Sequence, residues 1–193
     1  MTLRQVKETM PAASPEEITW HVRLFENPAS PVSFAGAIDL EPHDCIHILL
    51  GRGLRSQDEA FIIGYTMGTN KKFCPTWQFW AFRLIARYFY PSPYKFRDSD
   101  LVAFNLGFAR GEKSKIEKIQ NIDLNSDYYL DKTIDEIRDE LEISVQALRA
   151  TYRKEKALIP NTFESKRLPI NAAQDVFDLE LPDGPDSDWV KEK

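Results

Sequence analysis

The chain has 193 residues, a length that suits one domain or one domain with a tail. Apolar residues make up 42% of it, enough for a sizeable core, and its net charge of −5 argues against a nucleic-acid-binding protein with a basic surface. Cys45 and Cys74 form no metal-binding or redox motif, and no apolar segment approaches the ~18 residues of a membrane-spanning helix. No signal or transit peptide is visible, so we expect a cytoplasmic protein.

The predicted elements are helices, in a chain with three parts: a frayed start at residues 1–13, a helical domain at 14–158 and an acidic, proline-containing tail at 159–193. Ser14-Pro15-Glu16 is typical of a helix start, with serine as the N-cap and proline in the first helical position. Ser30-Pro31 repeats this signal and predicts a shorter helix over roughly residues 31–40. In the tail, prolines among acidic residues predict an extended or disordered chain.

Five more helices are expected between residues 42 and 153. They begin at helix-start signals or follow a helical spacing of apolar residues, and glycine or proline ends several of them. No segment alternates apolar and polar residues over the length of a strand, so we predict a mostly α fold. The expected ranges are Pro42 to Leu50, Ser56 to about Thr69, Pro75 to about Tyr90, Asp98 to about Arg110, and Asp131 to about Arg153.

The candidate chemistry begins with two of the chain's three histidines. His43 and His47 are four residues apart in an expected helix, which advances about 400° over that spacing and places both rings on one face. Asp44 adds a carboxylate at the neighbouring edge of this face, although it could instead complement a helix N-terminus. Apolar residues follow the pair in the sequence, unlike a solvated helix face, and this favours a metal site.

Glu59 lies 12 residues beyond His47 and could not reach the same ion along one continuous helix. Gly51 and Gly53 allow the chain to turn back, which would bring Glu59 to the histidines from the next helix. Imidazole and carboxylate ligands together suit Zn²⁺ and other divalent ions. Two simpler alternatives stay open: the histidine pair as a polar helix face, and Glu59 as the capping-box partner of Ser56.

The spacing H-D-x-x-H, eleven residues, then Glu resembles the signature of the coenzyme Q (ubiquinone) biosynthesis protein four family. In this chain it is HDCIHILLGRGLRSQDE, and Glu41 stands two places before the first histidine, as in the family. The segment YYLDKTIDEIRDELEI resembles the C-terminal part of the family, so that the resemblance covers roughly residues 20–145. The chain departs from the family at Asp58, where glycine is usual, and lacks a tryptophan expected after the paired tyrosines.

The resemblance implies a homodimer of mostly helical chains, attached peripherally to a membrane, with a long hydrophobic cavity for a polyprenyl lipid. It makes Glu41 a candidate to support the metal site from outside. Zinc is the metal commonly assigned to the family, with magnesium or another divalent ion as the alternative. The implied partners are a prenylated quinone precursor and other quinone-biosynthesis enzymes. The ligands carried over to this chain are His43, Asp44, His47 and Glu59.

An aromatic segment lies between Pro75 and Pro91. As a helix it would have little polar surface, which is more typical of a buried core helix. The resemblance offers a second interpretation, in which this helix is a wall of the lipid cavity. Arg83 and Arg87, four residues apart, would then contact an anionic head group.

Three functions remain in view. The first is a metal- and polyprenyl-lipid-binding protein of ubiquinone biosynthesis that removes the carboxyl group of a prenylated hydroxybenzoate, with hydroxylation at the same ring carbon. The second is a non-catalytic lipid-binding scaffold for quinone-biosynthesis enzymes. The third is a metal-dependent phosphohydrolase of the H…HD…D type, which would use His21, His43, Asp44 and Asp123.

Overall fold

The computed structural model of the chain describes residues 1–10, 34–70, 72, 74–92 and 95–171. The regular structure of these residues is helical, and they hold no strand, only an isolated antiparallel bridge between Thr2 and Thr133. The mostly α prediction is therefore confirmed. None of the described helices combines the length and the apolar character needed to span a bilayer.

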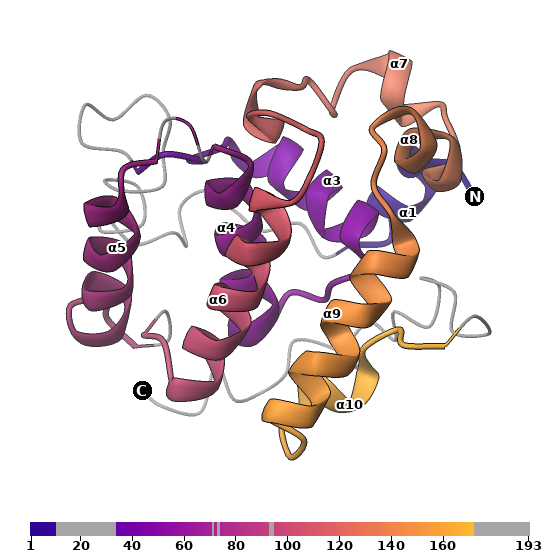
Figure 1. Cartoon of the computed structure of the whole chain (residues 1–193). Coiled ribbons are helices and arrows are strands. Elements are labelled where there is room, and N and C mark those ends of the chain that lie inside the picture. Colours follow the sequence, from indigo (N-terminus) through magenta and orange to yellow (C-terminus); the bar gives the residue numbers. More distant parts are fainter. Residues whose placement is uncertain (11–33, 71, 73, 93–94, 172–193) are drawn as a thin grey trace.

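Two helices, α4 (Ser56–Thr69) and α6 (Asp98–Glu112), lie side by side in the middle of the molecule (Figure 1). Glycines let their backbones touch. A Cβ atom on Gly64 of α4 would lie 2.2 Å from a carbonyl oxygen of α6, and one on Gly107 of α6 would lie 2.1 Å from a carbonyl oxygen of α4. No side chain fits in that space, so the close approach of the two helices depends on these glycines.

A further helix, α5 (Thr76–Tyr88), lies at one side of this pair, at the left of Figure 1. Its inner face packs on α6 through aromatic rings, with the Phe79 ring centroid 4.6 Å from that of Phe108 and the Phe82 centroid 5.0 Å from that of Phe104. The helix expected after Pro75 is confirmed, but it is only half buried. The exposed large side chains at its outer face and end are Trp77, Trp80, Leu84, Tyr88 and Phe89.

The remaining elements lie above, behind and to the right of the central pair in Figure 1. They are α1 (Leu3–Lys7), α3 (Leu40–Leu50), the short 3₁₀ helix η2 (Ile119–Asn121), α7 (Asp127–Leu130), α8 (Ile134–Glu140), α9 (Val145–Leu158) and α10 (Phe163–Arg167). Among them, α1 packs on α3 and α7, α8 packs on α3, and α9 packs on α6 and α10.

The first ten residues contain a docked helix, which differs from the frayed start expected for residues 1–13. Leu3 and Val6 of α1 are buried, and Thr2 forms a capping box with Gln5 at the helix start. Of the helix expected at 31–40, residues 34–39 contain a turn but no helix, with Gly36 at φ 93°, and residue 40 already begins α3. The helix expected from Ser14 lies outside the described residues.

The helix expected from Asp131 to Arg153 is in fact two helices. After α8 the chain turns through Glu142 at φ 52°, and the Ser144 side chain caps α9 by accepting the N–H of Ala147. The tail expected to be extended from residue 159 instead begins with α10, which packs on α9. Residues from 172 onward lie outside the described part.

Candidate metal centre

The candidate ligands come from two consecutive helices joined by a tight turn. α3 ends at Gly51, whose backbone takes the left-handed values φ 67° and ψ 41°, a conformation that glycine adopts without strain. The chain reverses over residues 51–55, and α4 begins at Ser56. In consequence Glu59, in the first turn of α4, lies against His43 and His47 of α3, as the turn at Gly51 had predicted.

The three side chains converge on one point. Glu59 Oε1 lies 3.3 Å from His47 Nε2, and Glu59 Oε2 lies 3.5 Å from His43 Nε2. The two imidazole centroids are 4.7 Å apart, with the ring planes at 73°. Each side chain offers one ligand atom, and all three atoms lie within 4.8 Å of one another, close enough to hold a shared metal ion. Imidazole nitrogen with carboxylate oxygen is a donor set that divalent transition metals bind.

His47 is the residue whose environment best fits a metal. Its Nδ1 lies 2.6 Å from the carbonyl oxygen of Gly53, and because a carbonyl oxygen can only accept, Nδ1 must carry the proton of this bond. The side chain is 1% exposed, and its Nε2 has no hydrogen-bond partner among the described residues. An unprotonated Nε2 would set its lone pair against the Glu59 carboxylate, so a cation or a proton must lie between them.

The charges at the site differ from residue to residue. Burial lowers the pKa of His43 to about 4, although Glu59 opposes the shift. Burial also disfavours the charged form of His47, but Glu59, Asp58 and the Gly53 carbonyl outweigh it and raise the pKa of His47. Burial would raise the pKa of Glu59, yet the two histidines more than offset it and the pKa is lowered. Glu59 is therefore ionised, and His47 is the histidine that holds a proton when no metal does.

The capping-box alternative for Glu59 is excluded by the start of α4. The N-cap is Arg55, so Ser56 is already the first helical residue. The Ser56 hydroxyl donates to Asp100 of α6 at 2.8 Å and makes no cap hydrogen bond. The side chain of Glu59 is thus directed to the histidines and has no part in capping the start of the helix.

Asp44 does not belong to the group of three ligand atoms, although it interacts electrostatically with both His47 and Glu59. Burial raises its pKa to about 6. Its role as a fourth ligand stays a prediction. Cys45, the next residue, is a buried thiol whose pKa burial raises to about 11, as expected for a small core side chain.

Glu41 lies at the edge of the site and makes polar contacts away from it. It accepts a hydrogen bond from Asn125 and lies 3.6 Å from the Lys7 ammonium group. Its carboxylate also raises the pKa of Asp44. These contacts tie the start of α3 to α1 and to the segment before α7. Supporting the metal through Asp44 stays a prediction for Glu41.

The other predicted residues lie elsewhere. Arg83 and Arg87 are on α5, where Arg83 stacks over the Trp80 ring at 4.9 Å and Arg87 lies 3.3 Å from Asp98. His21, needed for the phosphohydrolase, lies outside the described residues. Asp123, its other proposed ligand, acts electrostatically on Cys45 and is not in the group of three ligand atoms.

Sequence reasoning missed a buried ionic cluster behind the site. Arg52, in the turn, pairs with Asp58 of α4 and with Glu155 of α9. Arg52 could have been singled out from the sequence, since it stands between the two glycines that frame the turn. Nothing in the sequence pointed to Glu155, because it lies on an amphipathic helix far along the chain.

Comparisons of the chain with models of known protein families, with curated proteins and with solved structures found no match.

Proposed function

We propose that this chain is a metal- and polyprenyl-lipid-binding protein that acts in quinone biosynthesis, in the manner of the family its H-D-x-x-H and Glu signature resembles. The metal would be one divalent ion held by His43, His47 and Glu59. The observation that carries the metal part of this proposal is the buried Nε2 of His47, which lies 3.3 Å from the ionised carboxylate of Glu59 without meeting hydrogen-bond geometry.

Zinc is the metal we expect, because two imidazoles and one carboxylate are a ligand set of catalytic zinc sites, which keep a further position open for water or substrate. His43 is 17% exposed and Glu59 33% exposed, so this position would open toward solvent. Asp44 would either fill it or remain beside it. When bound, the metal would supply Lewis acidity toward an oxygen of a prenylated aromatic acid.

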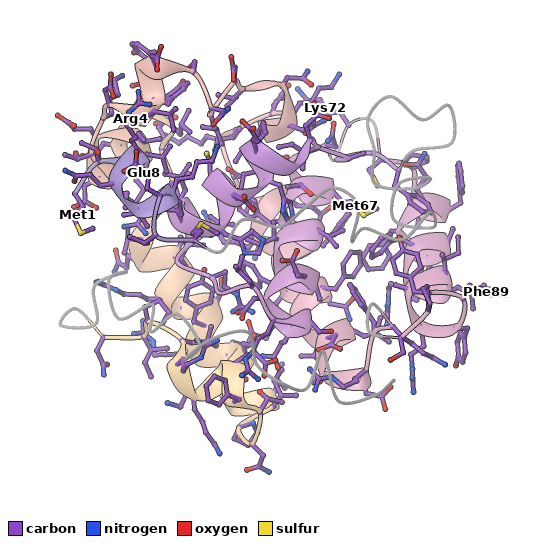
Figure 2. All side chains as sticks on the ribbon, turned by 180° about the vertical axis from the view of Figure 1, so that it is seen from behind. Met1, Arg4, Glu8, Met67, Lys72 and Phe89 are labelled. Atoms are coloured by element: carbon purple, nitrogen blue, oxygen red, sulfur yellow. The ribbon has the colours of Figure 1, made fainter. Side chains whose placement is uncertain are left out.

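The outer face of α5 supports the lipid part of the proposal. Trp77, Trp80, Leu84 and Tyr88 recur every three or four residues, each more than half exposed, and so form one apolar stripe along the helix. Tryptophan and tyrosine suit the boundary between water and lipid. Phe89, the C-cap residue of α5, is also exposed and lies at the edge of the molecule (Figure 2). We propose that this stripe contacts the membrane from which the lipid substrate is taken.

A scaffold without catalysis is the second candidate. The apolar stripe and the metal group lie on different elements, so α5 could bind a lipid surface or a quinone-biosynthesis enzyme while the metal only joins α3 to α4. A metal that can be removed without loss of lipid binding, together with no turnover of a prenylated hydroxybenzoate, would favour this candidate.

The test is metal analysis with native mass spectrometry on protein purified without chelators or a metal-affinity tag. We expect one divalent ion per chain, a co-purifying isoprenoid, and loss of the ion in His47→Ala with the helical circular dichroism unchanged. His21→Ala is the matched control and should keep the ion. Full metal content in His47→Ala would overturn the assignment, and loss in His21→Ala would favour the phosphohydrolase.

A further inference from the structure

A cluster of buried charges lies directly behind the metal group. The Arg52 guanidinium donates to both carboxylate oxygens of Glu155, at 3.0 Å each, and its Nε lies 3.1 Å from Asp58 Oδ1. Arg52 and Glu155 have no exposed side-chain surface, and Asp58 is 3% exposed. Burying such ions is unfavourable unless each is well paired, and replacing a buried pair with apolar residues is often neutral for stability. We therefore looked to this buried ionic cluster for a role other than stabilising the fold.

The cluster spans the turn that brings Glu59 to the histidines. The backbone N–H of Arg52 donates to the carbonyl of His47 at 2.9 Å, while its guanidinium donates to the carbonyl of Gln57 at 3.2 Å. One residue thus joins the last turn of α3 to the first turn of α4. Glu155, 103 residues away on α9, fixes this residue from outside the turn.

The same cluster packs against Gly53, whose carbonyl orients His47. A Cβ atom on Gly53 would lie 2.9 Å from Asp58 Oδ2 and 3.1 Å from the Arg167 guanidinium, so these two side chains close around the glycine. The Gly53 carbonyl accepts the Nδ1 proton of His47. Contacts therefore run from Glu155 through Arg52 and Asp58 to Gly53, and from there to the imidazole.

We propose that Arg52 and Glu155 are positioning residues of the metal centre. They hold the turn so that the Gly53 carbonyl keeps the proton of His47 on Nδ1 and directs Nε2 toward Glu59 and the ion. Some residues fix a metal-binding histidine by bonding to its second ring nitrogen. Mutation of such residues typically lowers metal affinity 10–100-fold. The inference rests on the proposed metal function, which it deepens.

Two further side-chain contacts hold the end of α3. The Tyr152 hydroxyl donates to the carbonyl of Leu50 at 2.5 Å, and Arg138 Nε donates to the carbonyl of Leu49 at 2.9 Å. Both carbonyls belong to the last turn of α3, where no further helical N–H can reach them. Residues of α8 and α9 thus set the position of the helix that carries both histidines.

The experiment compares Glu155→Gln and Gly53→Ala with the wild type, using Co²⁺ and Zn²⁺ as probes. Glu155→Gln keeps the shape of the side chain and removes its charge. Gly53→Ala removes no charge, but its added Cβ would lie 2.9 Å from Asp58 Oδ2 and so displace the turn. Leu148→Ala is the matched control, because Leu148 is buried on α9 outside the ionic cluster and its truncation lowers stability alone.

We expect both test variants to weaken metal binding by about 10–100-fold and to shift the Co²⁺ visible spectrum, while Leu148→Ala binds like the wild type. In metal-free protein, at a pH above the raised pKa of His47 where its ring is neutral, ¹⁵N NMR of the imidazoles should find the Nδ1–H form of His47 in the wild type and a mixture of the Nδ1–H and Nε2–H forms in Glu155→Gln. Wild-type affinity and spectrum in both variants, or an equal loss in Leu148→Ala, would overturn the proposal.

Failure of the metal function would be recognised separately. If the wild type binds neither ion, the proposed function is wrong. The NMR comparison on metal-free protein then still decides whether Arg52 and Glu155 position His47. A change of the His47 form in Glu155→Gln would then support positioning by the cluster, and an unchanged form would refute it.

Discussion

At the scale of single residues, the metal group could be predicted because its geometry is local. The interval of four residues between His43 and His47 fixes their shared face, and glycine at position 51 permits the reversal that returns Glu59. The complete set of ligands cannot be predicted from sequence spacing alone. Whether Asp44 joins depends on a side-chain direction that helical spacing leaves open, since it stands at the edge of the face.

The pH dependence of metal binding tests the role of Asp44. Above pH 6, we expect each unit of pH decrease to weaken Zn²⁺ binding about tenfold once His47 is protonated, because the ion displaces one proton from this raised-pKa imidazole. His43, with a pKa of about 4, contributes no proton there. Below pH 6 a second proton should be displaced, from Asp44, whose pKa is about 6. Competition with a chromophoric chelator between pH 5 and 7.5 measures both slopes.

Asp44→Asn is the control for that titration. It should show a single displaced proton down to pH 5, because it removes the carboxyl group that titrates near pH 6. Identical slopes in the variant and the wild type would mean that Asp44 is not a ligand. Two displaced protons in the variant would mean that His43 also holds a proton at these pH values.

At the scale of elements, most helices could be predicted, but the break between α8 and α9 could not. Ile134, Ile137, Leu141, Val145 and Leu148 keep a helical spacing straight through the break, so apolar periodicity gives no sign of it. The turn contains neither glycine nor proline, and Glu142 takes the left-handed conformation that glycine usually fills. Only the Ser144 cap hints at a new helix start.

The close contact between α4 and α6 was also unpredicted, and Gly107→Ala tests it. Alanine is the better helix former, but its Cβ would overlap the carbonyl oxygen of Phe61 on α4. We expect a loss of about 2 kcal/mol in the free energy of unfolding, because the helices must separate. Urea denaturation measures the loss.

The control on the same helix is Ala109→Gly, at an exposed position. It should lower the free energy of unfolding by only ~1 kcal/mol, the difference in helix propensity between the two residues. An unchanged or increased stability of Gly107→Ala would contradict a backbone contact between α4 and α6.

At the scale of the whole molecule, the metal group and the apolar stripe of α5 occupy different regions joined by the α4–α6 pair. α5 makes its inner contacts through phenylalanines, and in the part of the chain that the structure describes its opposite face is exposed. The sequence predicted a buried helix here, because it does not reveal how many faces of an aromatic helix pack against other elements. The two regions can therefore be altered independently.

A double variant of the stripe, Trp80→Ser with Leu84→Ser, tests its contact with membranes. Both side chains are more than half exposed, so the fold and the metal content should remain unchanged. Removing two apolar side chains, each contributing ~1.5–3 kcal/mol when fully buried in lipid, should weaken binding to vesicles more than tenfold. Co-sedimentation with vesicles that contain anionic lipid measures this, since Arg83 and Arg87 lie beside the stripe.

Leu158→Ser is the matched control, because Leu158 is 56% exposed but lies at the end of α9, away from α5. If the control loses as much vesicle binding as the double variant, binding depends on general surface hydrophobicity rather than on the stripe. If neither variant loses binding, the stripe does not meet lipid, and the scaffold function, with a protein partner on α5, becomes the better explanation of its exposure. A loss confined to the double variant, at full metal content, would show that lipid contact and metal binding reside on separate surfaces of one chain.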